Sequence, residues 1–246
     1  MTQEFPRIVP VGLTGVLVTF SDQLSREANS AALAFRARLQ AEKMVGVVET
    51  TTSLTSAFAV FDAAVVTRDT VTGQLRELLA EQDWMKSPLP ANRKLWRVPS
   101  VFEGAFAPQL PEAAQLAQVD ADTAVEQICS APLRVLTLGF APGQPYLGSL
   151  PHNWDIPRQT GITKQVPVGA ITVAIRQIVL FSTPNPTGWR QVGQCAFQSF
   201  RPNQANPFAL NPGDEMQFHP VSVSEFNDLR NDDSSGNGGA TWETLS

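Results

Sequence analysis

The residues best suited to holding a ligand lie in a loop at positions 139–148, which is rich in glycine and proline. A glycine such as Gly143 lets the backbone approach a ligand closely, because it has no Cβ. Phe140 and Tyr146 add aromatic surface, and Pro142 stiffens the chain between them. The final Gly-Lys-Ser/Thr of a Walker A loop is missing. The loop is therefore a candidate pocket wall, with a tight structural loop as the alternative.

Two further groups of residues follow this loop at short distance. Arg158 and Lys164 are cations beside Asp155, and a guanidinium offers a planar fork for a carboxylate or a phosphate. Gly188 precedes Trp189 at the start of an expected strand, where the indole would form one wall of a cleft. The alternatives are a solvated surface arginine and a core tryptophan.

The remaining nucleophiles and metal ligands form no recognisable motif. The two cysteines, Cys129 and Cys195, and the two histidines, His152 and His219, lack the spacing of a zinc site. We interpret the cysteines as separate small hydrophobic residues, with a disulfide as the alternative. Ser149 lies close to His152 but not in a Gly-x-Ser-x-Gly elbow. No catalytic residue and no metal ligand is assigned.

The composition indicates a folded protein that binds neither nucleic acid nor membrane. Of 246 residues, 43% are hydrophobic and 17% charged, which is enough apolar material for a real core. The formal net charge of −5, without a run of Lys or Arg, argues against a nucleic-acid binder. The N-terminus does not resemble a signal peptide, and no 18-residue stretch is continuously apolar. We expect a cytoplasmic protein.

The first part of the chain predicts an α+β domain over residues 1–98. Short β-branched runs predict strands, and apolar residues at helical spacing predict two amphipathic helices. The expected order is a strand at 12–20, a helix to about 39, strands at 45–52 and 56–62, and a helix from about 70 to 84. A last strand at 93–98 would complete a ferredoxin-like β-α-β-β-α-β pattern.

The second part predicts a β-rich domain over residues 99–230. Two short helices at 108–117 and 120–129 and a strand at 133–138 form an adapter. From residue 139 onward, short β-prone runs separated by Gly and Pro are typical of a barrel or sandwich. Residues 231–246, rich in Gly and Ser at their start, are expected to be a flexible tail.

Several of these segments together resemble a known protein family. The order and approximate spacing match over about a third of the chain, in the segments 138–151, 156–158, 166–169, 188–189, 192–193 and 211–214. The family pattern reads approximately G-F-x-P-G-F-x-Y-L-G-G-L, T-P-R, V-P-x-G-S-V, G-G-W, I-G-R-T and P-G-D. On these motifs the chain resembles the family that contains the B subunit of 5-oxoprolinase, the KipI kinase inhibitor and the first allophanate hydrolase subunit.

The resemblance implies a cyclophilin-like β-barrel in the C-terminal domain and a cyclophilin-like partner of the KipA type, equivalent to the C subunit of 5-oxoprolinase. With a further amidohydrolase subunit, such a pair supports ATP-dependent opening of a lactam, and the complex rather than this chain uses the ATP. The implied function is thus a 5-oxoprolinase-like hydrolase subunit that is not active alone. A non-catalytic KipI-like inhibitor of a histidine kinase and a urea or allophanate pathway subunit are the alternatives.

The chain departs from the family pattern at several polar positions. Gln144 replaces the second aromatic residue of the loop, Ala170 replaces a serine, and Thr163 stands where an arginine is expected. Cys129 replaces a histidine. Losing such groups removes transition-state stabilisation, so the loop supports binding more firmly than catalysis. The expected ligand-binding residues are Phe140, Pro142, Gly143, Tyr146, Arg158, Lys164, Gly188 and Trp189.

Overall fold

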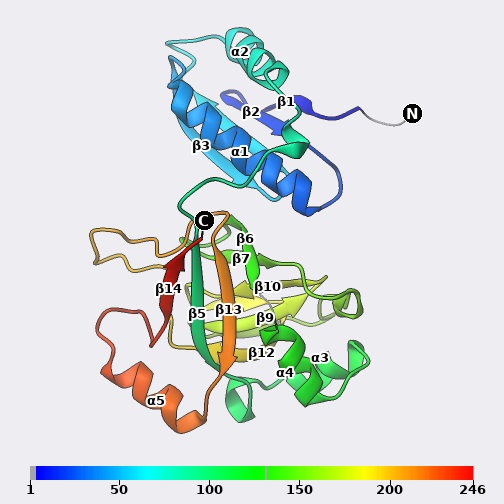
Figure 1. The fold of residues 1–246 in the computed structure, drawn as a ribbon, viewed down its shortest axis with the longest axis vertical. Coiled ribbons are helices and arrows are strands. Elements are labelled where there is room, and N and C mark those ends of the chain that lie inside the picture. The colour runs from blue at the N-terminus through cyan, green and yellow to red at the C-terminus, as the bar shows by residue number, and fades with distance from the viewer. Residues whose placement is uncertain (1–3, 131, 246) are drawn as a thin grey trace. The chain divides into compact units, whose positions relative to one another are not determined.

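The computed structural model describes residues 4–130 and 132–245. The chain divides between Ala91 and Asn92 into two compact units, each with a buried apolar core of its own. The N-terminal unit contains one antiparallel sheet in the order β1-β2-β4-β3, with two helices α1 and α2 (Figure 1). Its elements are β1 (Arg7–Val11), β2 (Gly15–Thr19), α1 (Arg26–Glu42), β3 (Val47–Ser53), β4 (Ser56–Phe61), α2 (Arg68–Ala80) and a short 3-10 helix, η1 (Trp84–Lys86).

Both predicted helices are present, and both pack on this sheet through one apolar cluster. Small alanines of α1, such as Ala31 and Ala32, are fully buried and allow close packing, while Val71 and Leu75 supply the buried side of α2. Ser25 caps the start of α1, because its hydroxyl accepts a hydrogen bond from an amide of the first turn.

The ferredoxin-like connectivity predicted for this unit is not confirmed, and its last predicted strand belongs elsewhere. The edge strand that pairs with β2 is β1, which comes before all the predicted elements in the sequence, and not the predicted last strand. The expected last strand is β5 (Lys94–Val101), which pairs in the second unit. The division between the units therefore lies before this strand rather than near residue 98.

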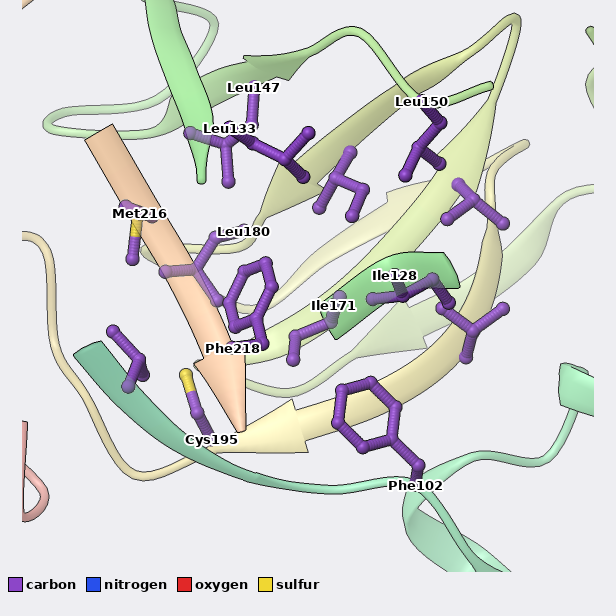
Figure 2. Packing of buried hydrophobic residues seen from close by; sticks show 14 of the residues in the cluster. Phe102, Ile128, Leu133, Leu147, Leu150, Ile171, Leu180, Cys195, Met216 and Phe218 are labelled. Carbon is purple, nitrogen blue, oxygen red and sulfur yellow. The ribbon is translucent and has the colours of Figure 1, made fainter. Parts of the chain in front are cut away.

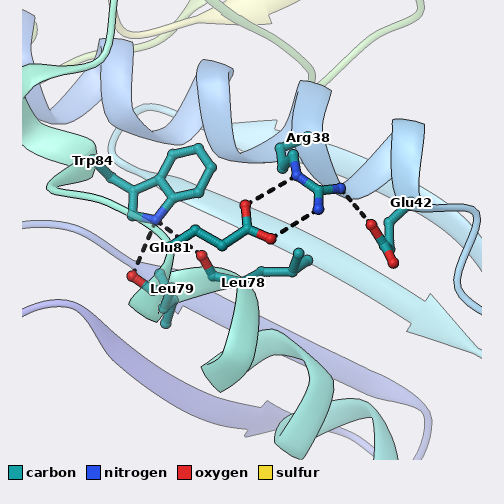
Figure 3. A network of polar contacts seen from close by, with 6 residues as sticks. All are labelled: Arg38, Glu42, Leu78, Leu79, Glu81 and Trp84. Carbon is teal, nitrogen blue, oxygen red and sulfur yellow. Dashed lines mark hydrogen bonds and ion pairs between the residues drawn. The ribbon is translucent and has the colours of Figure 1, made fainter.

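A polar network joins the elements of the N-terminal unit at its surface (Figure 3). The Arg38 guanidinium of α1 donates to both carboxylate oxygens of Glu81, at 3.0 and 2.8 Å, and also pairs with Glu42. The indole of buried Trp84 donates to the carbonyl of Leu79, 3.2 Å away, near the end of α2. Exposed ion pairs of this kind contribute little to stability, so the apolar cluster holds the unit together.

The second unit is built around a closed barrel of seven strands. Their order is β12-β9-β10-β7-β6-β13-β5, and β5 closes the ring by pairing with β12. The β13–β5 pair is parallel and the other pairs are antiparallel. The barrel strands are β5, β6 (Leu133–Leu138), β7 (Pro145–Gly148), β9 (Ala170–Ala174), β10 (Gln177–Leu180), β12 (Arg190–Cys195) and β13 (Glu215–Pro220). This confirms the barrel expected for the C-terminal part.

Apolar side chains fill the interior of the barrel, as Figure 2 shows. Leu147, Leu180 and Phe218 point inward from three different strands and are almost completely buried. Ile128 reaches the same cluster from α4 (Ala121–Cys129), and Phe102 reaches it from the end of β5. The barrel is thus a packed core rather than a ligand channel.

Further helices and strands surround this barrel. The predicted adapter helices are present as α3 (Leu110–Leu116) and α4, after a short 3-10 helix η2 (Gly104–Phe106). Asp120 caps α4 by accepting a hydrogen bond of 2.7 Å from the amide of Thr123. In the described part of the chain, no helix combines the length and the apolar character needed to cross a membrane.

The expectation of a flexible tail at 231–246 is wrong for the described residues. The helix α5 (Val223–Asp232) runs into this segment, and β14 (Thr241–Thr244) pairs with β5. The Trp242 ring lies 6.3 Å from that of Trp96, and the Lys94 ammonium lies 4.3 Å from the Trp242 ring centre. The Gly/Ser-rich turn between α5 and β14 is held by Asp233, whose carboxylate accepts hydrogen bonds from backbone amides.

Candidate functional site

The loop that follows β6 is shaped by its own backbone hydrogen bonds. The backbone amide of Gly139 donates to the carbonyl of Gln144 (3.0 Å), and the backbone amide of Gln144 donates to the carbonyl of Ala141 (3.1 Å). Phe140 has a positive φ of 70° and is 74% exposed. Gly143 also has a positive φ, and a Cβ there would crowd the segment around Ser199. The loop therefore turns Phe140 outward and buries Gln144 at its base.

The two faces of β7 and β10 serve different purposes. Leu147 and Ile178 face the barrel interior, because successive residues of a strand point to opposite sides. Tyr146, Val179 and Phe181 belong to a separate apolar cluster, together with Trp189. The outer face of these two strands therefore forms the floor of a site that lies outside the barrel.

A pocket of about 270 Å³ lies on this outer face. Pockets that bind drug-sized ligands have volumes from about 300 Å³ upward, so this pocket suits a smaller molecule. It brings together five of the eight expected binding residues, Phe140, Tyr146, Arg158, Gly188 and Trp189. Gln144, Val179, Phe181, Pro186 and Thr187 complete its lining.

The opposite wall of the pocket is held in place by hydrogen bonds from two directions. It contains a two-stranded sheet of β8 (Thr163–Val166) and β11 (Asn185–Thr187), and a 3-10 helix η3 (His152–Trp154) precedes it in the chain. The Gln159 amide donates to the Gly188 carbonyl (2.7 Å), and its side chain donates to the Trp189 carbonyl (2.8 Å). These contacts fix the segment that carries the cation of the site.

The charge inside the pocket is positive. The Arg158 guanidinium lies 5.5 Å from the centre of the Trp189 ring, a cation–π distance. None of the ten residues that line the pocket carries a carboxylate, an imidazole or a thiol. The pocket can therefore bind an anionic group, but it offers no obvious nucleophile or general base for hydrolysis.

Tyr146 is the titratable group on the pocket floor. Its ring meets that of Trp189 edge to face, with centres 6.1 Å apart. Burial raises the pKa of the phenol, while Arg158 and a hydrogen bond from the Gln144 side chain act in the opposite direction. The phenol therefore stays protonated at neutral pH.

Gln144 is the unusual residue of this pocket. Its side chain is almost completely buried, with 1% of the residue exposed. The amide group interacts with the Tyr146 phenol, but the Oε1 atom has no hydrogen-bond partner within the described chain. Buried polar atoms are nearly always paired, so this oxygen requires an explanation.

Three expected binding residues lie outside the pocket lining. Pro142 is exposed on the loop, Gly143 faces the segment around Ser199, and Lys164 is exposed on β8. Among the lining residues that were not predicted, Val179 and Phe181 have a signal in the sequence, because they alternate with inward-facing residues of β10. Pro186 and Thr187 had none, since only folding brings β11 beside the loop.

The other residues with possible chemistry do not form a second site. His152 and Ser149 are exposed and are not among the residues lining the pocket. Cys129 and Cys195 are free thiols, and burial raises the pKa of each to about 12. Over the described ranges, no group of three or more His, Cys, Asp or Glu side chains is placed to hold a metal ion.

The sequence matches the family described as "Carboxyltransferase domain, subdomain C and D" over residues 6–210. This match covers most of the chain and both units, so the chain belongs to this family. The motifs that suggested the resemblance, including the 139–148 loop, all fall within the matched region or directly follow it.

Comparison with individual proteins gives the same assignment. The chain is 24% identical over 230 residues to the 5-oxoprolinase B subunit of Bacillus subtilis, covering 89% of this chain and 95% of that protein. The crystal structure of TTHA0988 matches with a TM-score of 0.72 and 25% identity, covering 85% of this chain and only 40% of that one. Kluyveromyces lactis urea carboxylase shares the fold, with a TM-score of 0.75, 17% identity and coverage of 98% and 25%.

Proposed function

We propose that this chain is one subunit of an ATP-dependent complex that hydrolyses a lactam or amide, of the 5-oxoprolinase type. The relative from Bacillus subtilis, which it matches over nearly its full length, is named as one subunit of 5-oxoprolinase, and that name supports a role within a complex. In this proposal the partner is a KipA-like chain, the C-type subunit, and a further amidohydrolase subunit takes part in the reaction. The complex uses ATP, and this chain holds no cofactor of its own.

The observation that carries this proposal is the small pocket with one cation, Arg158, above an apolar floor. A 5-oxoproline-like substrate has a ring that matches the aromatic walls and a carboxylate that pairs with a guanidinium. Charge-assisted hydrogen bonds of this kind are roughly twice as strong as neutral ones. The pocket contributes binding and orientation, and the chemical groups for hydrolysis come from the other subunits, because its lining lacks them.

Co-expression of the chain with the subunits encoded beside it, followed by an assay of 5-oxoproline-dependent ATP hydrolysis, tests the proposal. The variant Arg158→Ala is expected to lower activity at low substrate concentration by about 10- to 100-fold, because a hydrogen bond to a charged group contributes about 1.5–3 kcal/mol. Lys164→Ala is the matched control, since Lys164 is an exposed cation of the same unit outside the pocket lining. A complex without activity, or one unaffected by Arg158→Ala, would contradict the proposal.

A second candidate function is that of a non-catalytic KipI-like inhibitor of a histidine kinase. It is favoured by a pocket lining without carboxylate, imidazole or thiol, and by the loss of the family serine at Ala170. Affinity purification from the native host at native expression separates the two. Recovery of a kinase without any amidohydrolase subunit supports the inhibitor, and recovery of a KipA-like chain supports the hydrolase. Urea and allophanate as substrates in the assay above test the third alternative.

A further inference from the structure

Gln144 places an unpaired hydrogen-bond acceptor at a pocket whose other polar side chains are Arg158, Tyr146 and Thr187. Its Oε1 atom is buried and has no partner in the described chain, although the residue is 1% exposed. Leaving such an atom unpaired costs about as much as the loss of a hydrogen bond, so native proteins rarely tolerate it without a reason. At a residue that lines a pocket, a bound ligand can supply the missing hydrogen bond.

The neighbouring residue fixes the orientation of this amide. The Gln144 side chain interacts with the phenol of Tyr146, which engages one of the two N–H donors of the amide. The edge-to-face contact with Trp189 in turn holds the Tyr146 ring. The amide oxygen is thus the buried polar atom of Gln144 that has no partner within the described chain.

We propose that Gln144 is a specificity-determining residue that selects a ligand with an N–H donor beside its carboxylate. The inference rests on the proposed function, because it assumes that the Arg158 pocket is the substrate site. In it, Arg158 pairs with the carboxylate and Gln144 Oε1 accepts the N–H of a secondary amide or lactam. An analogue with a ring oxygen in place of the N–H would bring two acceptors together and leave both unpaired. Sites of this kind reject ligands that lack the matching donor.

The same residue distinguishes this chain from the family pattern, which has an aromatic side chain at the position of Gln144. A phenyl ring there would extend the apolar floor and would recognise no donor. The amide therefore changes what the pocket can recognise in this chain, while the loop around it keeps its glycines and its turn.

The test measures binding of two probes to the full chain, alone and in the co-expressed complex, by isothermal titration calorimetry. The probes are 5-oxoproline and the corresponding lactone, which differ only by N–H against oxygen. The wild-type protein is expected to bind the lactam at least about tenfold more tightly, which corresponds to about 1.4 kcal/mol. Gln144→Met, similar in size but without the acceptor, should bring the ratio close to one.

The controls separate failure of this inference from failure of the proposed function. Arg158→Ala should weaken both probes by the same factor, and Gln177→Met, a change at another buried glutamine outside the pocket lining, should leave the ratio unchanged. Equal binding of lactam and lactone by the wild-type protein overturns the role of Gln144 but does not contradict the carboxylate site. The same conclusion follows if Gln144→Met keeps the wild-type ratio of lactam to lactone affinity. Absence of binding to either probe, in the chain and in the complex, overturns both proposals. The wild-type ratio needs no variant, so the test does not depend on the folding of Gln144→Met.

Discussion

The two faces of β7 and β10 have opposite roles. On the inner face, Leu147 (Figure 2) and Ile178 belong to the continuous core inside the closed barrel. On the outer face, Tyr146 and Val179 form a floor beneath a cation and an amide oxygen without a partner in the described chain. A core gains stability by satisfying all its groups, whereas a binding site keeps some of them free for a ligand. The difference shows that one strand can contribute to both a core and a binding site, because successive side chains point to opposite faces.

The largest expected effect comes from opening a cavity on the inner face. Leu147→Ala should lower the free energy of unfolding by about 2–5 kcal/mol, because Leu147 is fully buried and its neighbours can collapse only partly. The neighbouring change Tyr146→Phe removes only a hydroxyl at the pocket and should cost no more than about 1.5 kcal/mol. Urea unfolding of both variants measures the contrast. Equal losses would show that the two faces do not differ as described.

Tyr146→Phe should instead act on ligand selection. The phenol interacts with the Gln144 side chain, so its removal takes away one of the contacts that orient the amide. The preference for 5-oxoproline over its lactone should then fall, although less than in Gln144→Met. An unchanged preference would mean that packing alone orients the amide.

An intermediate effect is expected where the barrel supports the pocket wall. The Arg190 side chain is only 7% exposed and donates to Glu112 (2.8 Å) and to the carbonyl of Pro157 (2.6 Å), next to Arg158. Arg190→Met should cost about 1–3 kcal/mol of stability, since it removes a charge-assisted hydrogen bond to Glu112 and a hydrogen bond to the Pro157 carbonyl, and should also weaken carboxylate binding.

The matched control for this variant is Arg97→Met. Arg97 pairs with Glu243, but both side chains are about half exposed, and such pairs contribute about 0–1 kcal/mol. Unfolding curves and calorimetry with 5-oxoproline measure the two quantities. If Arg190→Met destabilised the chain but left ligand affinity intact, the support of the pocket wall by Arg190 would be disproved.

The smallest effect concerns the thiols. Burial raises the pKa of Cys195, inside the barrel, to about 12, so less than about 0.1% of it is thiolate at pH 8. Its labelling by a thiol reagent should be very slow in the native chain and become fast on unfolding. Because the folded pKa lies above the unfolded value of about 9, ionisation favours the unfolded chain, and stability should fall as pH rises from about 9 towards 12.

Cys195→Ala serves as the control, because the remaining signal then reports Cys129 on α4. That thiol also has a raised pKa of about 12, but it is only partly buried, so it should react before Cys195 does. Rapid labelling of Cys195 at pH 8 in the native state would contradict the description of the barrel as a closed core.

Local sequence patterns predicted most elements because each depends on a few neighbouring residues. The two N-terminal helices, the adapter helices and the short strands after residue 139 follow from apolar spacing and turn residues. The strand at Lys94–Val101 was also recognised, but its partners were not. Pairing with β13 and β12 joins residues more than 90 positions apart, and no local pattern encodes that choice.

The same limit applies to the tail. A Gly/Ser-rich run predicts flexibility, but Asp233 orders the turn and Trp242 packs beside Trp96. These contacts depend on β5 being in place, and composition alone does not reveal them.

The amino-acid sequence alone determined the turns of the site. Gly143 and Gly169 have positive φ angles, and a Cβ would be crowded at Gly143 and would clash with the Cys195 carbonyl at Gly169, so backbone geometry favours glycine at both positions. It also indicated Arg158, Tyr146 and Trp189 as binding residues before any fold was known.

Only the tertiary structure decided that these residues share a pocket on the outside of the barrel, and that Lys164 does not line it. It also showed that Gln144 is buried at the pocket, whereas the sequence presents this residue only as a departure from the family pattern. Whether a buried amide oxygen is paired depends on every segment folded around it. That information comes from distant parts of the chain, and it exists only once they have packed together.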